Sequence, residues 1–197
     1  CKTRSCAIIT RIYETLDLAM PLHDRILGHF QASAQTKLDA ALGAGRTFLG
    51  SMQLPDDQAA IVTFDSAGRR VQPLTGSRAE IELALATIDA NQGTRIDKGL
   101  ELALAELLGS RHRERNNPVI VLLSDGLPER GSERRTLEIA LDARAAGIEL
   151  FTIGLGQDAD VDLLWLLAGD SSRTFEAPEA SELRTIYSQI AGRVLCY

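Results

Sequence analysis

The sequence has no apolar run that approaches the roughly 20 residues a helix needs to cross a bilayer. It also lacks an excess of basic charge, since 21 Lys and Arg residues are interspersed with 27 Asp and Glu residues to give a net charge of −6. Nucleic acid and acidic membranes are therefore not expected partners. No signal peptide is recognisable. The 197 residues, 45% of them hydrophobic, suffice for one globular domain with a sizeable core.

Cysteine is scarce and confined to the ends of the chain, at Cys1, Cys6 and Cys196. The spacing fits no zinc site, because the three histidines are scattered. Since the termini of single domains often meet, a disulfide from Cys196 to Cys1 or Cys6 is one interpretation, and it would stabilise the fold by up to about 5 kcal/mol. Free thiols in a reducing cytoplasm are the alternative. The terminal positions favour the disulfide, and with it an extracytoplasmic or cell-surface location.

Signatures of side-chain catalysis are also missing. Ser124 beside Asp125 is not part of a GxSxG elbow, no histidine is placed to act as its base, and no acidic pair is identifiable as a general acid and base. The sequence therefore predicts a protein that is not an enzyme.

The most informative stretch is residues 118–126, Pro-Val-Ile-Val-Leu-Leu-Ser-Asp-Gly. Its apolar run is long enough for a strand, too short for a helix, and shows no alternation, which is typical of a strand buried on both faces. Such strands occur in parallel sheets covered by helices. Ligands of open α/β sheets bind at the carboxyl ends of strands, so Asp125 is a candidate binding residue.

Strands and helices alternate along the rest of the chain. Strands are predicted at residues 59–64, 71–74, 148–155 and 174–175, and helices at 37–49, 77–88, 96–108, 133–146, 161–167 and 178–194. This order predicts a doubly wound, Rossmann-like α/β fold, with a mostly parallel sheet, one short antiparallel edge strand and helices on both faces. Residues 7–34 show no clear pattern. We therefore expect an N-terminal extension over residues 1–15 and the domain over residues 16–197.

Several segments in this order resemble a von Willebrand factor type A domain of the bacterial type. They are Lys37–Leu49, Ile61–Asp65, Val71–Thr75, Gly93–Leu100, Val119–Gly126 and Ala146–Gly154, and the resemblance covers roughly residues 16–194. It implies a sheet that binds a protein partner at its top face, where the strands end, commonly through a divalent cation.

In that family magnesium usually occupies a metal-ion-dependent adhesion site. The resemblance carries its threonine to Thr94 and its last aspartate to Asp125. Its first loop, DxSxS, aligns best with Asp24 as the aspartate, but Ile26 and Gly28 replace both serines. Magnesium takes six oxygens and these residues supply three at most, so Mg²⁺ or another divalent cation is expected to bind weakly if at all. No other cofactor is expected.

The partner surface implied by the resemblance comprises Asp24, Arg25, Thr94, Asp125 and Leu127, and the partner would offer an acidic residue to a bound cation. Without a cation, the loops at residues 25–35 and 127–132 are expected to bind the partner directly. A metal-independent scaffold domain in a larger protein is the alternative.

Two of these residues also have a purely structural interpretation. Thr94 followed by Asp97 is typical of a helix N-cap with an acidic third residue, and Asp24 of a surface turn. Trp165, in a run of leucines, is expected to pack in the core or at its edge.

A motif of a different class lies near the end of the chain. Gly154–Ala159 formally matches the dinucleotide fingerprint GxGxxA, with Glu176 about 20 residues further on, as in a nucleotide-binding oxidoreductase. However, Asp158 and Asp160 put negative charge where a pyrophosphate would sit, and the motif follows a late strand. A glycine turn in which one of these aspartates caps the next helix is the favoured interpretation.

Overall fold

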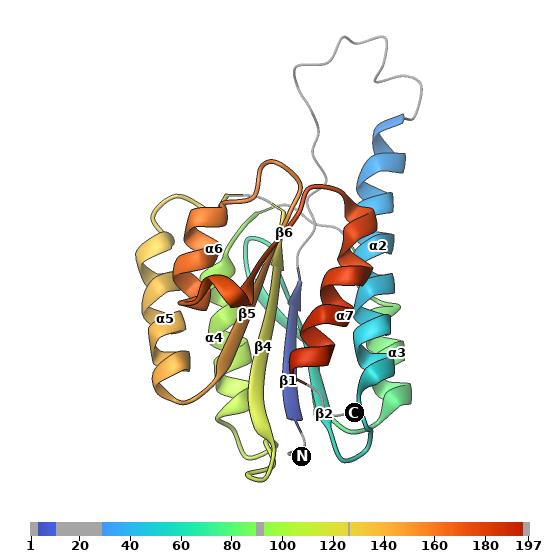
Figure 1. Cartoon of the computed structure of the whole chain (residues 1–197), viewed down its shortest axis with the longest axis vertical. Helices are drawn as coiled ribbons and strands as arrows, with labels where there is room; N and C mark the ends of the chain where they lie inside the picture. Colours follow the sequence, from blue (N-terminus) through green and yellow to red (C-terminus); the bar gives the residue numbers. More distant parts are fainter. Residues whose placement is uncertain (1–3, 11–28, 90–92, 126, 195–197) are drawn as a thin grey trace.

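The computed structural model describes residues 4–10, 29–89, 93–125 and 127–194 (Figure 1). They form a six-stranded sheet with the strand order β3-β2-β1-β4-β5-β6. All neighbouring strands are parallel except the β2–β3 pair at one edge, which is antiparallel. The strands are β1 Arg4–Thr10, β2 Gln58–Phe64, β3 Gly68–Thr75, β4 Asn117–Ser124, β5 Glu149–Leu155 and β6 Thr174–Ala177. The predicted fold class is thus confirmed.

Helices cover both faces of the sheet. In Figure 1, α2, α3 and α7 lie on one side of the strands and α4, α5 and α6 on the other. The helices are α2 His29–Ser51, α3 Arg78–Leu85, α4 Ile96–Leu107, α5 Glu133–Ala145, α6 Val161–Ala168 and α7 Leu183–Val194, with short 3₁₀ helices at Ser171–Arg173 and Ala180–Glu182. None of the described helices is both long and apolar enough to span a membrane.

Strand β4 shows why the apolar run in the sequence does not alternate. Val119, Val121 and Leu123 contribute to the core beneath α2 and α7, whereas Ile120 and Leu122 contribute to the core beneath α4, α5 and α6. Each of these side chains is completely buried. Because successive side chains of a strand point to opposite faces, a strand covered on both faces must be apolar at every position.

Strand β1 lies at the centre of the sheet, between β2 and β4. Residues 4–10 therefore belong to the domain, and their assignment to an N-terminal extension was wrong. The local signal was weak because only Ala7, Ile8 and Ile9 form an apolar run there, and the strand is defined instead by its ladders to both neighbours. Cys6 in this strand is completely buried. Cys1 and Cys196 lie outside the described residues, so a disulfide stays a prediction.

Of two smaller expectations about the helices, one is narrowed and one is corrected. Trp165 on α6 is 50% exposed, so of the expected positions in the core or at its edge only the edge is left. In a short helix with the sequence Val-Asp-Leu-Leu-Trp-Leu-Leu-Ala, the apolar residues surround the axis, so composition alone does not say which face is buried. Pro178 does not open the last helix, because α7 begins at Leu183 after a 3₁₀ turn.

Candidate functional site

The strand order creates an opening at the carboxyl edge of the sheet, meaning the end where the parallel strands terminate. The chain leaves β1 towards β2 on one side and leaves β4 towards β5 on the other, so the connections diverge between these two adjacent strands. Such a topological switch point is where open α/β sheets bind ligands. Asp125 directly follows β4 at this point and is 4% exposed, and Ser124 before it is also buried.

Backbone hydrogen bonds bring Thr94 to the same edge. The amide of Glu129, in the loop after β4, donates to the Thr94 carbonyl at 3.0 Å, and the amide of Arg95 donates to the Asp65 carbonyl after β2 at 2.8 Å. The loops after β2, before α4 and after β4 are therefore joined. Thr94 is buried at this junction, so the structure places it at the edge where Asp125 lies.

Gly93 permits this close approach. Its φ angle is +104°, and a Cβ atom at this position would lie 2.4 Å from the Ser66 backbone nitrogen. A residue with a side chain would have to adopt a strained backbone and push the two loops apart. The glycine before Thr94 is therefore a requirement of the site's geometry.

The proposed helix-cap role of Thr94 was wrong. The N-cap of α4 is Arg95, which makes no side-chain capping bond. Asp97 instead accepts hydrogen bonds from Arg95 Nε at 2.8 Å and Nη2 at 2.7 Å. The helix thus begins one residue later than the cap motif implied, and the acidic residue pairs with the Arg95 guanidinium.

The Asp97 carboxylate remains charged although only 1% of the residue is exposed. Burial by itself raises the pKa of Asp97, but hydrogen bonds and charge from Arg95, with a smaller contribution from Lys98, lower it more, so its pKa lies below the usual value. The same hydrogen bond is the main cause that raises the pKa of Arg95. This pair is a permanent ion pair at neutral pH.

A small open pocket lies beside the joined loops. It has a volume of about 150 Å³ and is lined by Arg95, Glu129, Arg130, Gly131 and Ser132. Sequence reasoning placed the loop at residues 127–132 in the partner surface but did not single out Arg95 or Arg130. The position of Arg95 beside Thr94 was the available signal.

Leu127, predicted to contact a partner, stands in the same loop and is 65% exposed. The other predicted partner residues in the first loop, Asp24 and Arg25, lie outside the described residues, as do Ile26 and Gly28 at the serine positions. The structure nevertheless corrects the alignment that selected Asp24, because the first strand ends at Thr10 and not near residue 22. In the sequence, Arg11 is the residue that directly follows this strand.

The described residues do not by themselves make a magnesium site. They contain no group of three His, Cys, Asp or Glu side chains that could hold a metal ion. Thr94 and Asp125 supply one hydroxyl and one carboxylate, whereas Mg²⁺ needs six oxygens in octahedral geometry. The positive charge of Arg95 beside Thr94 also opposes a cation.

The dinucleotide fingerprint proves to be a turn. Asp160 is the N-cap of α6, and its Oδ1 accepts from the Leu163 amide at 3.0 Å, as the turn interpretation predicted. The carboxylate therefore occupies the place where a pyrophosphate would bind. A Cβ atom on Gly154 would lie 3.0 Å from the Ala159 side chain, so this glycine serves the packing of α6 against β5. The motif also follows β5, away from the switch point.

Sequence comparison finds relatives that are longer than this chain. Mouse (Mus musculus) Matrilin-4 is 30% identical over 149 residues, which cover 75% of this chain and 22% of that protein. An uncharacterized protein of Synechocystis sp. is 29% identical over 142 residues, which cover 71% of this chain and 33% of that protein. The chain thus spans between about a fifth and a third of the length of these curated relatives.

Solved structures share the fold. Proximal thread matrix protein 1 from the mussel byssus superposes with a TM-score of 0.80 at 16% identity, covering 96% of this chain and 47% of that chain. The same mussel protein with a zinc-occupied metal-ion-dependent adhesion site has a TM-score of 0.74 at 20% identity, covering 97% and 46% of the two chains. The pilus tip protein Mfa5 from Porphyromonas gingivalis has a TM-score of 0.75 at 14% identity, with coverage of 98% and 96%.

A family model identifies the chain directly. The model of the von Willebrand factor type A domain matches residues 32–189, from α2 into α7. The match begins after β1 and after residues 11–28, the part of the sequence that departs most from the family's motif. The chain therefore belongs to the von Willebrand factor type A domain family.

Proposed function

We propose that this domain is a non-enzymatic protein-interaction module whose partner binds the carboxyl edge of the sheet around Thr94, Asp125 and Leu127. The observation that carries the proposal is the junction of three loops at the topological switch point, which puts Thr94 and Asp125 at one edge. Relatives named as a matrilin, a byssus matrix protein and a pilus tip protein support an adhesion or assembly role.

The size of the pocket favours a protein surface over a small-molecule substrate. Small-molecule sites are usually clefts of about 300–1,000 Å³. The pocket at this edge is about 150 Å³, the scale of a side chain. Leu127, exposed in the same loop as Glu129 and Arg130, adds apolar area of the kind found at protein interfaces.

Site-specific photo-crosslinking tests the proposal. A photo-reactive amino acid at Leu127 should give a covalent adduct with one protein in the source cells, and the adduct should be lost on Asp125→Ala. Leu83 is the matched control, since it is 70% exposed but lies on helix α3 and not in the loop after β4. An adduct of equal yield from both positions, or none from Leu127, would contradict the proposal and favour the metal-independent scaffold.

A weakly held divalent cation at Thr94 and Asp125 is a second candidate, because the resemblance carries the family's ligand positions to these two residues and a solved structure of the same fold holds zinc at its site. Calorimetric titration with Mg²⁺ and Mn²⁺ should then give heat that Asp125→Ala abolishes and Asp158→Ala, at an exposed aspartate in another loop, leaves intact. Absence of heat at millimolar metal would remove this candidate but leave partner binding unaffected.

A further inference from the structure

The pocket beside Thr94 has more unused hydrogen-bond donors than acceptors. Arg95 has five N–H bonds, of which two donate to Asp97, its sole acceptor among the described residues. Arg130 is exposed and has no acceptor in the described part of the chain. The two guanidinium groups therefore leave N–H donors available to a ligand.

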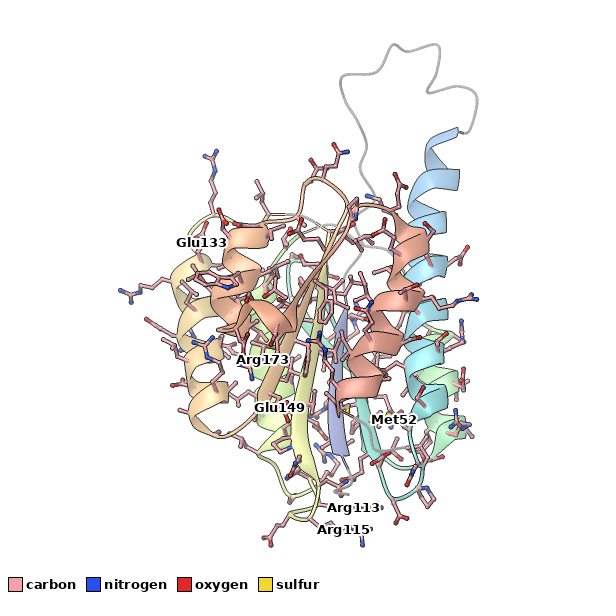
Figure 2. All side chains as sticks on the ribbon, viewed as in Figure 1. Met52, Arg113, Arg115, Glu133, Glu149 and Arg173 are labelled. Carbon is pink, nitrogen blue, oxygen red and sulfur yellow. The ribbon has the colours of Figure 1, made fainter. Side chains whose placement is uncertain are left out.

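The nearby acidic groups are mostly engaged. Both Asp97 oxygens accept from Arg95, and Glu133 Oε2 accepts from the Gly131 amide at 2.8 Å. Ser132 Oγ already donates to the Glu129 carbonyl at 2.6 Å. Within the lining of the pocket, the Glu129 carboxylate receives no hydrogen bond from any residue that the structure describes. Figure 2 shows Glu133 at this edge, at the start of α5.

We propose that this pocket binds the carboxylate of an acidic residue in the partner directly through Arg95 and Arg130, without a bound cation. Arginine is suited to this task because its planar fork binds a carboxylate with two parallel hydrogen bonds. Glu129 then accepts an N–H group of the same peptide. The inference rests on the proposed function, since it assigns the chemistry of the partner at the same edge.

Short peptides provide a probe that needs no knowledge of the partner. The peptide acetyl-Gly-Glu-Gly-amide, titrated into ¹⁵N-labelled protein in EDTA, should shift the amide signals of Gly131 and Ser132 saturably. The isosteric acetyl-Gly-Gln-Gly-amide should bind at least about three-fold more weakly, because it lacks the charge.

Variants with opposite expected signs separate a binding role from a structural one. Arg130→Gln should weaken binding of the glutamate peptide at least about three-fold, and Glu129→Gln should tighten it about two-fold, because each removes one exposed charge from the pocket. Arg134→Gln is the matched control for net charge. Its side chain is 90% exposed in the first turn of α5 and pairs with Glu138, so binding should stay unchanged.

Three results would overturn the inference. They are no saturable shift in EDTA, equal weakening by Arg130→Gln and Arg134→Gln, and shifts that require added Mg²⁺. The crosslinking experiment distinguishes this failure from failure of the proposed function. A Leu127 adduct without peptide binding would support the interaction module but contradict carboxylate binding by Arg95 and Arg130. Peptide binding without an adduct would support a carboxylate-binding pocket but contradict the protein partner.

Discussion

Helix α4 carries a buried carboxylate at each end, and the two are satisfied in different ways. Asp97 in its first turn, at the carboxyl edge, has Arg95 as its one arginine partner. Glu106 in its last turn accepts from Arg70 at 2.9 Å and twice from Arg111, at 2.5 and 3.0 Å. It also accepts from the Leu74 amide at 2.9 Å. Asp97 thus pairs with a single arginine, whereas Glu106 accepts hydrogen bonds from four donor atoms.

The helix dipole explains part of this difference. A negative charge is favourable at a helix N-terminus and unfavourable at a C-terminus, so Glu106 needs more compensation than Asp97. Its partners come from β3 and from the loop before β4, so the same carboxylate holds the edge strand to the sheet. Figure 2 shows Arg113 and Arg115 of that loop at the end of the molecule opposite Glu133.

The comparison separates a closed end of the molecule from an open one. At the amino edge, the end of the sheet opposite the carboxyl edge, arginine side chains bind groups of the chain itself. Arg113 donates to the Pro55 and Asp56 carbonyls, and Arg115 pairs with the Asp56 carboxylate. At the carboxyl edge, Arg95 and Arg130 retain donors. Stability is therefore concentrated at one edge and binding capacity at the other.

Removing the better-satisfied carboxylate should have the largest effect. Glu106→Ala should lower the free energy of unfolding by about 3–5 kcal/mol, because it leaves two arginines and the Leu74 amide without their shared acceptor. Urea unfolding measures this. Glu101→Ala on the same helix, where the carboxylate is 32% exposed, should cost no more than about 1 kcal/mol. Equal losses would erase the distinction between the buried cluster and a surface pair.

The carboxyl edge should be more sensitive to its backbone than to its charges. Gly93→Ala should cost about 2–3 kcal/mol, because the added methyl group strains a positive φ angle and meets the Ser66 backbone. Gly131→Ala is matched in φ, at +84°, but has open space around it and should cost about 1 kcal/mol. Indistinguishable urea midpoints for the two variants would show that the contact between the loops is unimportant.

Breaking the Arg95 pair should cost less than removing Glu106. Asp97→Asn should lower the free energy of unfolding by about 1–2 kcal/mol, because one charged acceptor with a partly exposed arginine is lost. The same change frees Arg95, so the glutamate peptide should bind more tightly. Weaker peptide binding in this variant would mean that Asp97 positions Arg95 and does not compete for it.

The dependence of stability on acid pH is expected to be the smallest effect, and it tests the carboxylates at both ends of α4 together. The Arg111 hydrogen bond is the largest cause that holds the pKa of Glu106 below its ordinary 4.5, and Asp97 lies below its ordinary 3.8. Because the pKa values are lowered on folding, the stabilisation is complete above those ordinary values and is lost as the pH falls through the folded ones. Urea midpoints should therefore decline below about pH 4.5, and less steeply in Glu106→Gln. An unchanged slope in that variant would assign the decline to other carboxyl groups.

Sequence reasoning succeeded where the local pattern of apolar and polar residues indicates which side chains are buried. The strand around Val119–Leu123 and the amphipathic helix α4 were predicted because each residue reports its own environment. At the start of α3, whose helix was predicted from residue 77, the Ser77 side chain accepts a hydrogen bond from the Glu80 amide. The candidate binding residues Thr94 and Asp125 came from the family resemblance, and both lie at the carboxyl edge of the sheet.

Sequence reasoning missed the roles of two charged side chains. Arg111 pairs with buried Glu106, whose other partners Arg70 and Leu74 come from β3, 36 and 32 residues away along the chain from Glu106. Arg95 was overlooked because the cap motif offered a sufficient local explanation for Thr94 and Asp97. In both places the acidic partner is near in sequence, two and five residues away, but the pairing does not follow a helix or strand period.

The sequence by itself determined a two-faced α/β sheet and its helices, because apolar periodicity specifies which residues must leave water. The family came from the resemblance of several segments in order. Only the tertiary structure decided that residues 4–10 form the central strand, since a run of three apolar residues becomes a strand there through its ladders to β2 and β4. It also decided which arginines pair with groups of the chain at the amino edge and which keep N–H donors for a ligand at the carboxyl edge. Pairing between charged groups depends on distances across the fold, and the linear order of residues does not set those distances.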